Sequence, residues 1–475
     1  MPFHYYDETA FFFYSRHCHT AAVSCSDEEF STGKSDLLDF STDTLRMDTL
    51  FSGVPSPTYS FMVYNNGDKG LRIRQVRLQK GNQTGFRVNV DGVFLDNSNG
   101  SQAQDFEIRG GDSLRVFVEL TSNKTYSDDP QHVEDNLLFM LESGTEQRVC
   151  LSAFTWDAVE LRNFTVSRDT TIMSDKPIVV YGGIKVDSCA TLTIKSPTRL
   201  YFHPNAGIDV FGKLVVEGKA NDEVVLRGDR LDHIFDYLPY DRLSGQWSGI
   251  RFRSSSTGNS ISFADIHSTN DAIVCDSAAL GTCRLRLENT TLHNCNGYGL
   301  RAVNSHISLV NCQITNTLGD CVSMVGGRLE LTYCTVAQFY PFSVNRGAAI
   351  SFGNTLNGVV LNERGSLICV NTAFTGYAED VVMGDSLSFD YHFLNCLLRT
   401  PAVSDSLRFQ NVIFESPKDS IQGEKHFRLV DIDLQDYDFH LDSLSTLRGK
   451  AMPVDGITDN RDGTLRGDTL NIGCY

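Results

Sequence analysis

The 475-residue sequence lacks any apolar run close to the roughly 20 residues that a membrane-spanning helix needs. It also has no run of Lys and Arg, and its 41 basic and 59 acidic side chains give a formal net charge of −18. Binding to nucleic acid or to an anionic membrane surface requires a positive footprint. We therefore expect no nucleic-acid partner, and contact with a membrane only through a lipid anchor.

The common catalytic and cofactor motifs are missing too. The chain contains no G-x-S-x-G, no H-E-x-x-H, no phosphate-binding loop and no dinucleotide fingerprint. Its 13 cysteines include no C-x-x-C pair, so neither a zinc ribbon nor a redox motif is supported. From these absences we predict neither a metal site nor a cofactor.

A short phrase recurs three times at a spacing of 22 positions, at residues 287–292, 309–314 and 331–336. A fixed period of this length is typical of a solenoid, in which each unit buries its apolar face only against its neighbours. Within each phrase the apolar residues alternate with a period of two, which indicates strands. The repeat predicts a parallel β-helix in which Leu309 faces the interior and Gln313 faces outward.

Asparagine recurs at one position of the repeat, where the chain has to bend. Asn tolerates the left-handed backbone conformation that such bends need. The members of this predicted corner column are Asn289, Asn311, Asn371, Asn395 and Asn411. Cys312, Cys334 and Cys396 follow the corner directly, and we expect them to pack as small apolar residues rather than to form disulfides or bind metal.

The chain divides into four predicted segments: an irregular leader and acidic linker (1–39), short alternating runs separated by turns (40–161), the coils (162–430) and a closing segment (431–475). One apolar and one polar face per run predict an antiparallel β-sandwich for the second segment. The repeats from residue 191 to 414 make roughly ten coils. An open strand edge favours aggregation, so we expect the sandwich to cap the first coil. The fold class is therefore all-β.

Three stretches carry a resemblance to a family. The first is in the leader, where Cys25 follows the small residues 21–24 and precedes the acidic cluster 26–29. The second consists of residues 43–51 and 110–114 in the predicted sandwich. The third is the tail, residues 459–475. Together they resemble surface lipoproteins of the Bacteroides group, which join an immunoglobulin-like domain to a right-handed parallel β-helix of the pectate-lyase-like superfamily. The resemblance implies lipidation at Cys25 and exposure on the cell outer membrane, or otherwise secretion. An acidic tail with an unmodified cysteine is the alternative.

The longest irregular insert, residues 228–247, combines carboxylates, guanidinium groups and aromatic rings. Rings that stack on a sugar and polar groups that bind its hydroxyls are what glycan recognition needs. We predict ligand binding by Asp229, Asp232, Tyr240, Arg242 and Trp247, with a polysaccharide or a surface protein as the partner. Two alternatives are a Ca²⁺ site and a solvated loop whose rings cover the side of a coil. A further alternative makes Trp247 a packing residue, because Gly245 and Gly249 around it suggest a strand that enters the wall.

Pectate lyases and polygalacturonases share the expected fold, but a fold alone does not establish a function. The outward positions of one repeated strand are Val274, Arg301, Ser323 and Ser351, and none of them is a carboxylate. The weak catalytic candidates are Asp271 and Asp320, two coils or about 9–10 Å apart, at the limit for an inverting carboxylate pair. The alternative is that both are turn residues in solvent.

We therefore expect a non-enzymatic, surface-exposed binding or structural protein that recognises glycans. The alternative is a polysaccharide lyase or glycoside hydrolase that acts on the face of the β-helix.

Overall fold

The computed structural model describes residues 29–475, except 236, 357, 362–364, 378, 384–388 and 420–422. Within this range the chain is all-β: it has strands, four short 3-10 turns and no α-helix. None of the described residues forms a helix long and apolar enough to cross a membrane. Cys25 lies outside the described residues.

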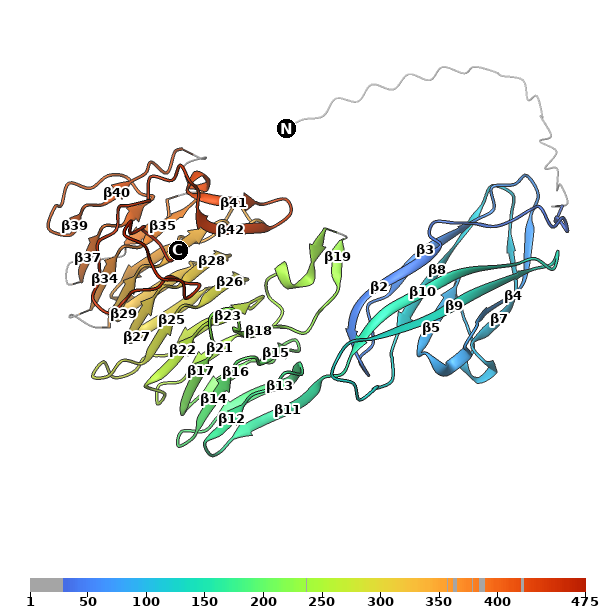
Figure 1. Cartoon of the computed structure of the whole chain (residues 1–475), viewed down its shortest axis with the longest axis horizontal. Coiled ribbons are helices and arrows are strands. Elements are labelled where there is room, and N and C mark those ends of the chain that lie inside the picture. Colours follow the sequence, from blue (N-terminus) through green and yellow to red (C-terminus); the bar gives the residue numbers. More distant parts are fainter. Residues whose placement is uncertain are drawn as a thin grey trace, which may run out of the picture.

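Residues 39–156 form two five-stranded sheets, which we call the N-terminal unit (Figure 1). Neighbouring strands are antiparallel except for β10 and β2, which pair in parallel. Apolar residues of both sheets, including Val63, Val116, Ile73 and Phe139, share one buried core. The sheet orders are β1-β3-β8-β5-β6 and β2-β10-β9-β4-β7, with β1 (Asp39–Phe40), β2 (Thr44–Phe51), β3 (Tyr59–Tyr64), β4 (Leu71–Leu78), β5 (Phe86–Val90), β6 (Val93–Phe94), β7 (Gln102–Ile108), β8 (Ser113–Leu120), β9 (Gln131–Leu141) and β10 (Glu146–Trp156).

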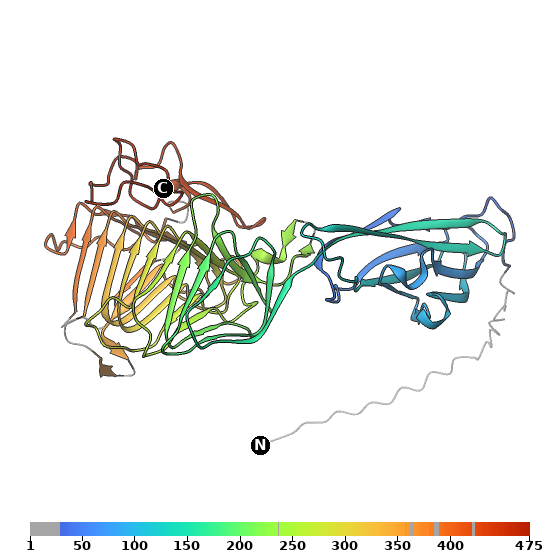
Figure 2. The same ribbon diagram turned by 60° about the horizontal axis from the view of Figure 1, so that its bottom comes forward.

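A single 26-stranded parallel sheet follows, from β11 to β40, and this arrangement fits a parallel β-helix. Figure 2 shows its strands stacked side by side along the molecule. Its first strand begins at Val159, so the expected boundary at residue 161 falls inside β11.

The strands of this sheet fall into three ladders of parallel pairs. The first is β11-β13-β15-β18-β23-β26-β28-β30-β35-β38-β40, the second is β11-β13-β16-β21-β24-β27-β29-β31-β36, and the third is β12-β14-β17-β22-β25-β27-β29-β34-β37-β39. The bounds are β11 (Val159–Val166), β12 (Thr170–Ile172), β13 (Ile178–Val186), β14 (Thr191–Lys195), β15 (Arg199–Phe202), β16 (Ile208–Val210), β17 (Lys213–Glu217), β18 (Val224–Gly228), β21 (Ile250–Phe252), β22 (Asn259–Ser262), β23 (Ala264–His267), β24 (Ile273–Cys275), β25 (Leu285–Glu288), β26 (Thr291–Cys295), β27 (Leu300–Val310), β28 (Gln313–Thr317), β29 (Val322–Thr332), β30 (Thr335–Gln338), β31 (Ile350–Gly353), β34 (Ser366–Val370), β35 (Ala373–Gly376), β36 (Val381–Met383), β37 (Asp390–Leu394), β38 (Leu397–Leu398), β39 (Phe409–Gln410) and β40 (Ile413–Phe414).

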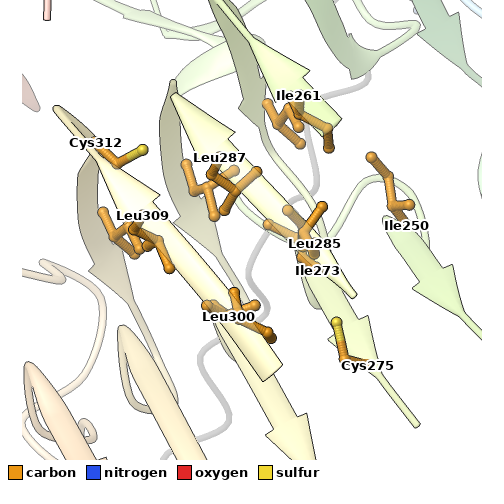
Figure 3. Close-up of a cluster of buried hydrophobic side chains, with 14 of the residues drawn as sticks. Ile250, Ile261, Ile273, Cys275, Leu285, Leu287, Leu300, Leu309 and Cys312 are labelled. Atoms are coloured by element: carbon orange, nitrogen blue, oxygen red, sulfur yellow. The ribbon is translucent and has the colours of Figure 1, made fainter. Parts of the chain in front are cut away.

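The predicted register of the repeat is confirmed. Leu287 pairs with Leu309, and Leu309 pairs with Leu331 on the following coil. All three are completely buried. Figure 3 shows Leu287 and Leu309 side by side in the interior, with Leu285 and Leu300 close by. The 22-residue period therefore corresponds to one coil.

The asparagine column occupies a corner, as predicted. Each of the five members has a positive φ, between 47° and 53°. Tyr333 takes the same position on its coil with a φ of 52°. Cys312, Cys334 and Cys396 are buried behind this corner, and none of them forms a disulfide.

The closing segment lies along the side of the coils rather than across their end (Figure 2). A hairpin comes first, formed by β41 (Phe427–Asp431) and β42 (Asp436–Leu441), so the expected boundary at residue 431 falls at the end of β41. The later residues of the segment then cover the asparagine corner. The amide nitrogen of Asn289 donates to the carbonyl of Asn460 at 2.6 Å, and that of Asn311 donates to Asp459 at 3.0 Å. The same corner residues thus turn the coils and hold the closing segment.

Gln313 faces outward, as predicted, but it is not exposed to solvent. Its side chain points away from the interior, but only 9% of it is exposed, because Tyr475 lies over it and donates a hydrogen bond to Gln313 Oε1 at 2.7 Å. The repeat defines which side of the strand a residue takes, whereas the cover comes from a segment about 160 positions away.

The expected cap over the first coil is also corrected. The N-terminal unit meets the coils at one corner, where Phe51 packs against Tyr201 at 5.0 Å between ring centroids and against Val179. Val159 and Met173, on and beside the first-coil strands, remain 43% and 66% exposed. The end of β2 and nearby turns of the N-terminal unit, rather than a sheet face, make this contact.

The buried leucine column gives a first prediction. Leu309→Ala should destabilise the protein by roughly 2–5 kcal/mol, because it leaves a cavity in a stacked apolar column. Ser308→Ala, on the outward side of the same strand, should stay within about 0.5 kcal/mol of the wild type. Chemical unfolding of both variants measures the difference. Equal midpoints for the two would contradict the register.

The closing segment gives a second prediction. The buried guanidinium group of Arg461 donates to Glu223 at 2.6 Å and to Thr291 at 2.9 Å. Arg461→Gln should weaken the docking of the segment by roughly 1–3 kcal/mol, because the Glu223 carboxylate loses its partner. Chymotrypsin, which cleaves after leucine but after neither arginine nor glutamine, should cut residues 442–475 faster in this variant. Arg428→Gln, on the exposed face of the hairpin, is the matched control and should be cut like the wild type.

Candidate ligand-binding cleft

A cleft of about 490 Å³ opens where the N-terminal unit, the first coils and the insert meet. The N-terminal unit contributes the end of β2 and the prolines after it, and the coils contribute Tyr181, His203 and Pro204 at the turns between the first and second ladders. The insert contributes residues 229–232, Tyr240 and residues 243–246. The predicted ligand residues Asp229, Asp232 and Tyr240 therefore lie in one cleft.

The insert lies between the two neighbouring parts of the chain. It contains β19 (His233–Phe235), β20 (Leu238–Pro239) and the 3-10 turn η3 (Tyr240–Arg242). His233 donates its backbone N–H to Asp48 at 2.9 Å, and its ring Nδ1 lies 3.0 Å from the same carboxylate. On the other side, Arg242 donates to the carbonyl of Leu434 at 2.7 Å. The insert thus joins the N-terminal unit to the C-terminal hairpin, as Figure 1 shows for β19.

One wall of the cleft is a row of aromatic and polar groups on the coils. The rings of Tyr181 and His203 lie 5.0 Å apart, and His203 Nδ1 lies 2.7 Å from a carboxylate oxygen of Asp229. The guanidinium of Arg162 lies 4.2 Å from the centre of the Tyr181 ring. Burial, followed by the negative charge of Asp229, raises the pKa of the Tyr181 phenol. At neutral pH this phenol is therefore protonated, and it can donate a hydrogen bond.

The opposite wall belongs to the insert. The guanidinium of Arg230 lies 3.9 Å from the centre of the Tyr240 ring and forms an ion pair with Asp232. Asp232 is only 3% exposed, so its charge is used mainly to hold Arg230 in place. Arg230 is fixed between a ring and a carboxylate, and the Tyr240 ring is fixed with it.

Trp247 does not belong to the cleft, which corrects its prediction as a ligand residue. Its side chain is completely buried among the coils and stacks on Phe202 at 4.1 Å, with 7° between the ring planes. Its indole N–H donates to the carbonyl of His267 at 2.8 Å. Gly245 and Gly249, both with positive φ, turn the chain back into the wall at this point. Arg242 likewise points to the hairpin and does not line the cleft.

Four candidate residues are absent from the set predicted from the sequence. Tyr181 and His203 lie in separate coils, 22 positions apart, and only the stacking of the coils brings them to the insert. At the tip of the insert, Phe235 and Tyr237 are 56% and 53% exposed and stack on each other at 5.7 Å. The sequence did contain one indication for Tyr181 and His203: their spacing of 22 positions equals the length of one coil, so the two residues could be expected to lie side by side.

The catalytic candidates Asp271 and Asp320 cap turns. Asp271 accepts a hydrogen bond from the backbone N–H of Tyr298 at 2.8 Å, and Asp320 accepts one from that of Ala348 at 2.9 Å. Each carboxylate thereby bonds to the next coil. Asp271 lines a second groove, of about 490 Å³, whereas Asp320 does not.

This second groove follows the outward face of the second ladder in its first coils. Its charged lining residues are Lys185, Asp209, Arg251, Arg253 and Asp271. Lys185 pairs with Asp209 in register, and Asp209 pairs with Arg251. The register confirms that Val274, Arg301, Ser323 and Ser351 form one column of paired residues, as predicted. On the preceding coils the same column continues with the charged residues Arg251, Asp209 and Lys185. The groove holds an ion pair between Arg253 and Asp209 at 2.6 Å.

Comparison with known proteins gives little further information. No family model matches the chain, and no curated protein matches it. Matching solved structures include a PapD-like domain of human CEP192 (10% identity, 26% of this chain and 87% of that one, TM-score 0.18) and the catalytic unit of a GH87 α-1,3-glucanase from Streptomyces thermodiastaticus (8%, 75% and 89%, TM-score 0.16). The VesB protease of Vibrio cholerae also matches, with 14% identity and a TM-score of 0.17. This match covers 26% of this chain and only 32% of the protease. TM-scores this low carry no argument about fold or function.

Proposed function

We propose that the protein is a non-enzymatic, surface-exposed glycan-binding protein whose ligand occupies the cleft between the N-terminal unit and the coils. The observation that carries the proposal is the meeting of Tyr181, His203, Asp229 and Tyr240 around one opening of about 490 Å³. This volume falls in the range of small-molecule sites, roughly 300–1,000 Å³.

The chemistry of the cleft suits a sugar. A pyranose ring offers an apolar face that packs on Tyr181 or Tyr240 and hydroxyl groups that bind polar partners. The His203–Asp229 pair offers both a ring nitrogen and carboxylate oxygens within 2.7 Å of each other. Because 50% of the His203 side chain is exposed, a ligand can reach this pair.

The walls are positioned before a ligand arrives. The Asp48–His233 contact and the apolar contact of Phe51 with Tyr201 hold the N-terminal unit against the coils. Side chains that are already ordered lose little conformational entropy on binding, which favours affinity. The N-terminal unit thus supports the cleft as well as preceding it.

We infer the finer architecture from the same observations. The two five-stranded sheets with a common core support an immunoglobulin-like sandwich, and the three parallel ladders support a right-handed β-helix of roughly ten coils. A rigid solenoid of this kind projects its variable loops for recognition. The resemblance at Cys25 alone leads us to propose a lipoprotein on the outer membrane.

The glycan proposal predicts the effect of removing the cleft side chains. The double variant His203→Ala/Tyr240→Ala should bind its best array glycan at least tenfold more weakly, because a stacking ring and a hydrogen-bonding partner are lost. A glycan array finds the ligand, and isothermal titration calorimetry measures its affinity. The matched control is His132→Ala/Tyr126→Ala, which removes the same two residue types from exposed positions of the N-terminal unit.

Circular dichroism spectra of both double variants establish that the fold is intact. Full glycan affinity in a folded His203→Ala/Tyr240→Ala variant would place recognition elsewhere. Absence of any glycan ligand for the wild type would contradict the proposed function itself.

The second groove favours one alternative function, a polysaccharide lyase or glycoside hydrolase. Asp209 and Asp271 supply carboxylates there, and Lys185 and Arg251 supply cations, all on the open face of the second ladder. Incubating the wild type with acidic and neutral polysaccharides distinguishes the two functions. New reducing ends or unsaturated products that disappear in Asp209→Asn/Asp271→Asn would replace the binding proposal with catalysis.

The lipid anchor gives a separate prediction. Full-length protein expressed in a host that processes lipoproteins should incorporate radioactive palmitate, and Cys25→Ala should abolish the label. Two or more acyl chains on one cysteine give stable membrane attachment, which one chain does not. Cys18→Ala is the matched control and should keep the label. Label retained in Cys25→Ala would exclude this cysteine as the anchor.

A further inference from the structure

Two histidines and an aspartate meet on the first ladder, away from the cleft residues described above. Asp265 and His267 belong to β23, and His293 belongs to β26 on the next coil. The parallel register places Asp265 opposite Thr291 and His267 opposite His293. Ile266, between the first two, is completely buried in the interior, so Asp265 and His267 project outward on the same side.

The ligating atoms of these three residues are already close together. Asp265 Oδ1 lies 3.1 Å from His267 Nδ1 and 3.0 Å from His293 Nε2. All three atoms lie within 4.8 Å of one another. A tetrahedral zinc ion with bonds of 2.0–2.1 Å holds its ligands about 3.3 Å apart. Two of the three separations therefore need almost no adjustment to accept such an ion.

A second, independent observation lies beside the cluster. His293 lines a cavity of about 250 Å³ together with Thr315 and Asn316. Thr315 pairs with His293 in register on the following coil. The Thr315 hydroxyl and the Asn316 side-chain oxygen are buried, each residue being 1% exposed, and neither atom has a hydrogen-bond partner among the described residues. Buried polar atoms without a partner are uncommon, and they indicate that a ligand or water belongs there.

The roof of this cavity comes from two distant parts of the chain. Arg242 reaches it from the insert, and Gln435, Asp436 and Tyr437 reach it from the C-terminal hairpin. Elements that do not belong to the ladder therefore border one side of the cavity. It offers space next to His293 for a water molecule or another small ligand.

We propose that Asp265, His267 and His293 form a binding site for a divalent transition-metal ion, with zinc as the best fit. Two imidazoles and one carboxylate are the ligand set of zinc sites that keep a fourth position open. Imidazole ligands disfavour Ca²⁺ and Mg²⁺, which take oxygen ligands. His293 also lines the cavity, and a water bound there would have the Thr315 hydroxyl and the Asn316 oxygen as hydrogen-bonding partners.

The metal would also link two consecutive coils through side chains. Asp265 and His267 come from one coil and His293 from the next, so the ion adds a cross-coil bond to the backbone ladder. The cluster lies directly behind the insert, because Ser268, next to His267, donates a hydrogen bond to the carbonyl of Asp241 at 2.6 Å. Metal binding is therefore expected to raise the thermal stability of this part of the coils.

The test uses full-length protein treated with a chelator and then titrated with Zn²⁺ by isothermal titration calorimetry. We expect one high-affinity equivalent in the wild type and a higher melting temperature when Zn²⁺ is present. Asp265→Asn and His293→Gln should each weaken binding at least tenfold. His392→Gln is the matched control: His392 lies 3.0 Å from Asp390 as a simple pair, and its loss should leave the affinity unchanged.

Co²⁺ gives a second readout that does not depend on the variants. Cobalt bound by nitrogen and oxygen shows d–d absorption without the thiolate charge-transfer band that ligation by any of the 13 cysteines would add. A thiolate band, the absence of a stoichiometric Zn²⁺ equivalent in the wild type, or equal affinity in the two ligand variants and the control would each overturn the proposal.

Discussion

The parallel pairing of one coil with the next is the interaction on which the rest of the structure depends. Each strand of the three ladders forms hydrogen bonds with the strand one repeat earlier and one repeat later. This pairing holds Leu287, Leu309 and Leu331 in one interior column and forces their neighbours to the outside. Every outward side chain consequently has a fixed neighbour about 4.8 Å away on the adjacent coil. The charged groove and the His–Asp cluster are both consequences of that fixed spacing.

The fold could be predicted further than the sites because periodic patterns are local. The leucines at residues 287, 309 and 331 and the corner asparagines recur at the spacing of a coil, so the sequence alone placed Leu309 inside and Asn311 at a bend. Gln313 shows where such reasoning stops: its direction followed from the period, but its cover by Tyr475 comes from a part of the chain with no repeat. Trp247 shows the same limit: Gly245 and Gly249 indicated that the chain returns to the wall there, but they did not identify Phe202 as the ring on which Trp247 stacks.

The candidate sites depend on which residues neighbouring coils bring together. Asp229, Asp232 and Tyr240 were recognised because they are close in sequence, whereas Tyr181 and His203 were not. For the His–Asp cluster, a D-x-H pair in a strand and a histidine about one coil later were visible in the sequence. The coil there has 26 residues rather than 22. The sequence alone therefore could not show that His267 and His293 are paired, and the register of the structure was needed to place them side by side.

The way the closing segment docks has a consequence for the order of events during synthesis. Arg461 contacts Glu223, which precedes it by 238 positions, and Asn460 contacts Asn289. Residues 159–414 can wind coil by coil as they leave the ribosome, because each coil needs only its predecessor. The side chains of Asn289 and Asn311, in contrast, lack their partners until residues 459–461 have left the ribosome, and that of Asn371 lacks its partner until Met452 has done so. Their amide groups therefore face solvent while the coils wind, and the closing segment covers them only afterwards.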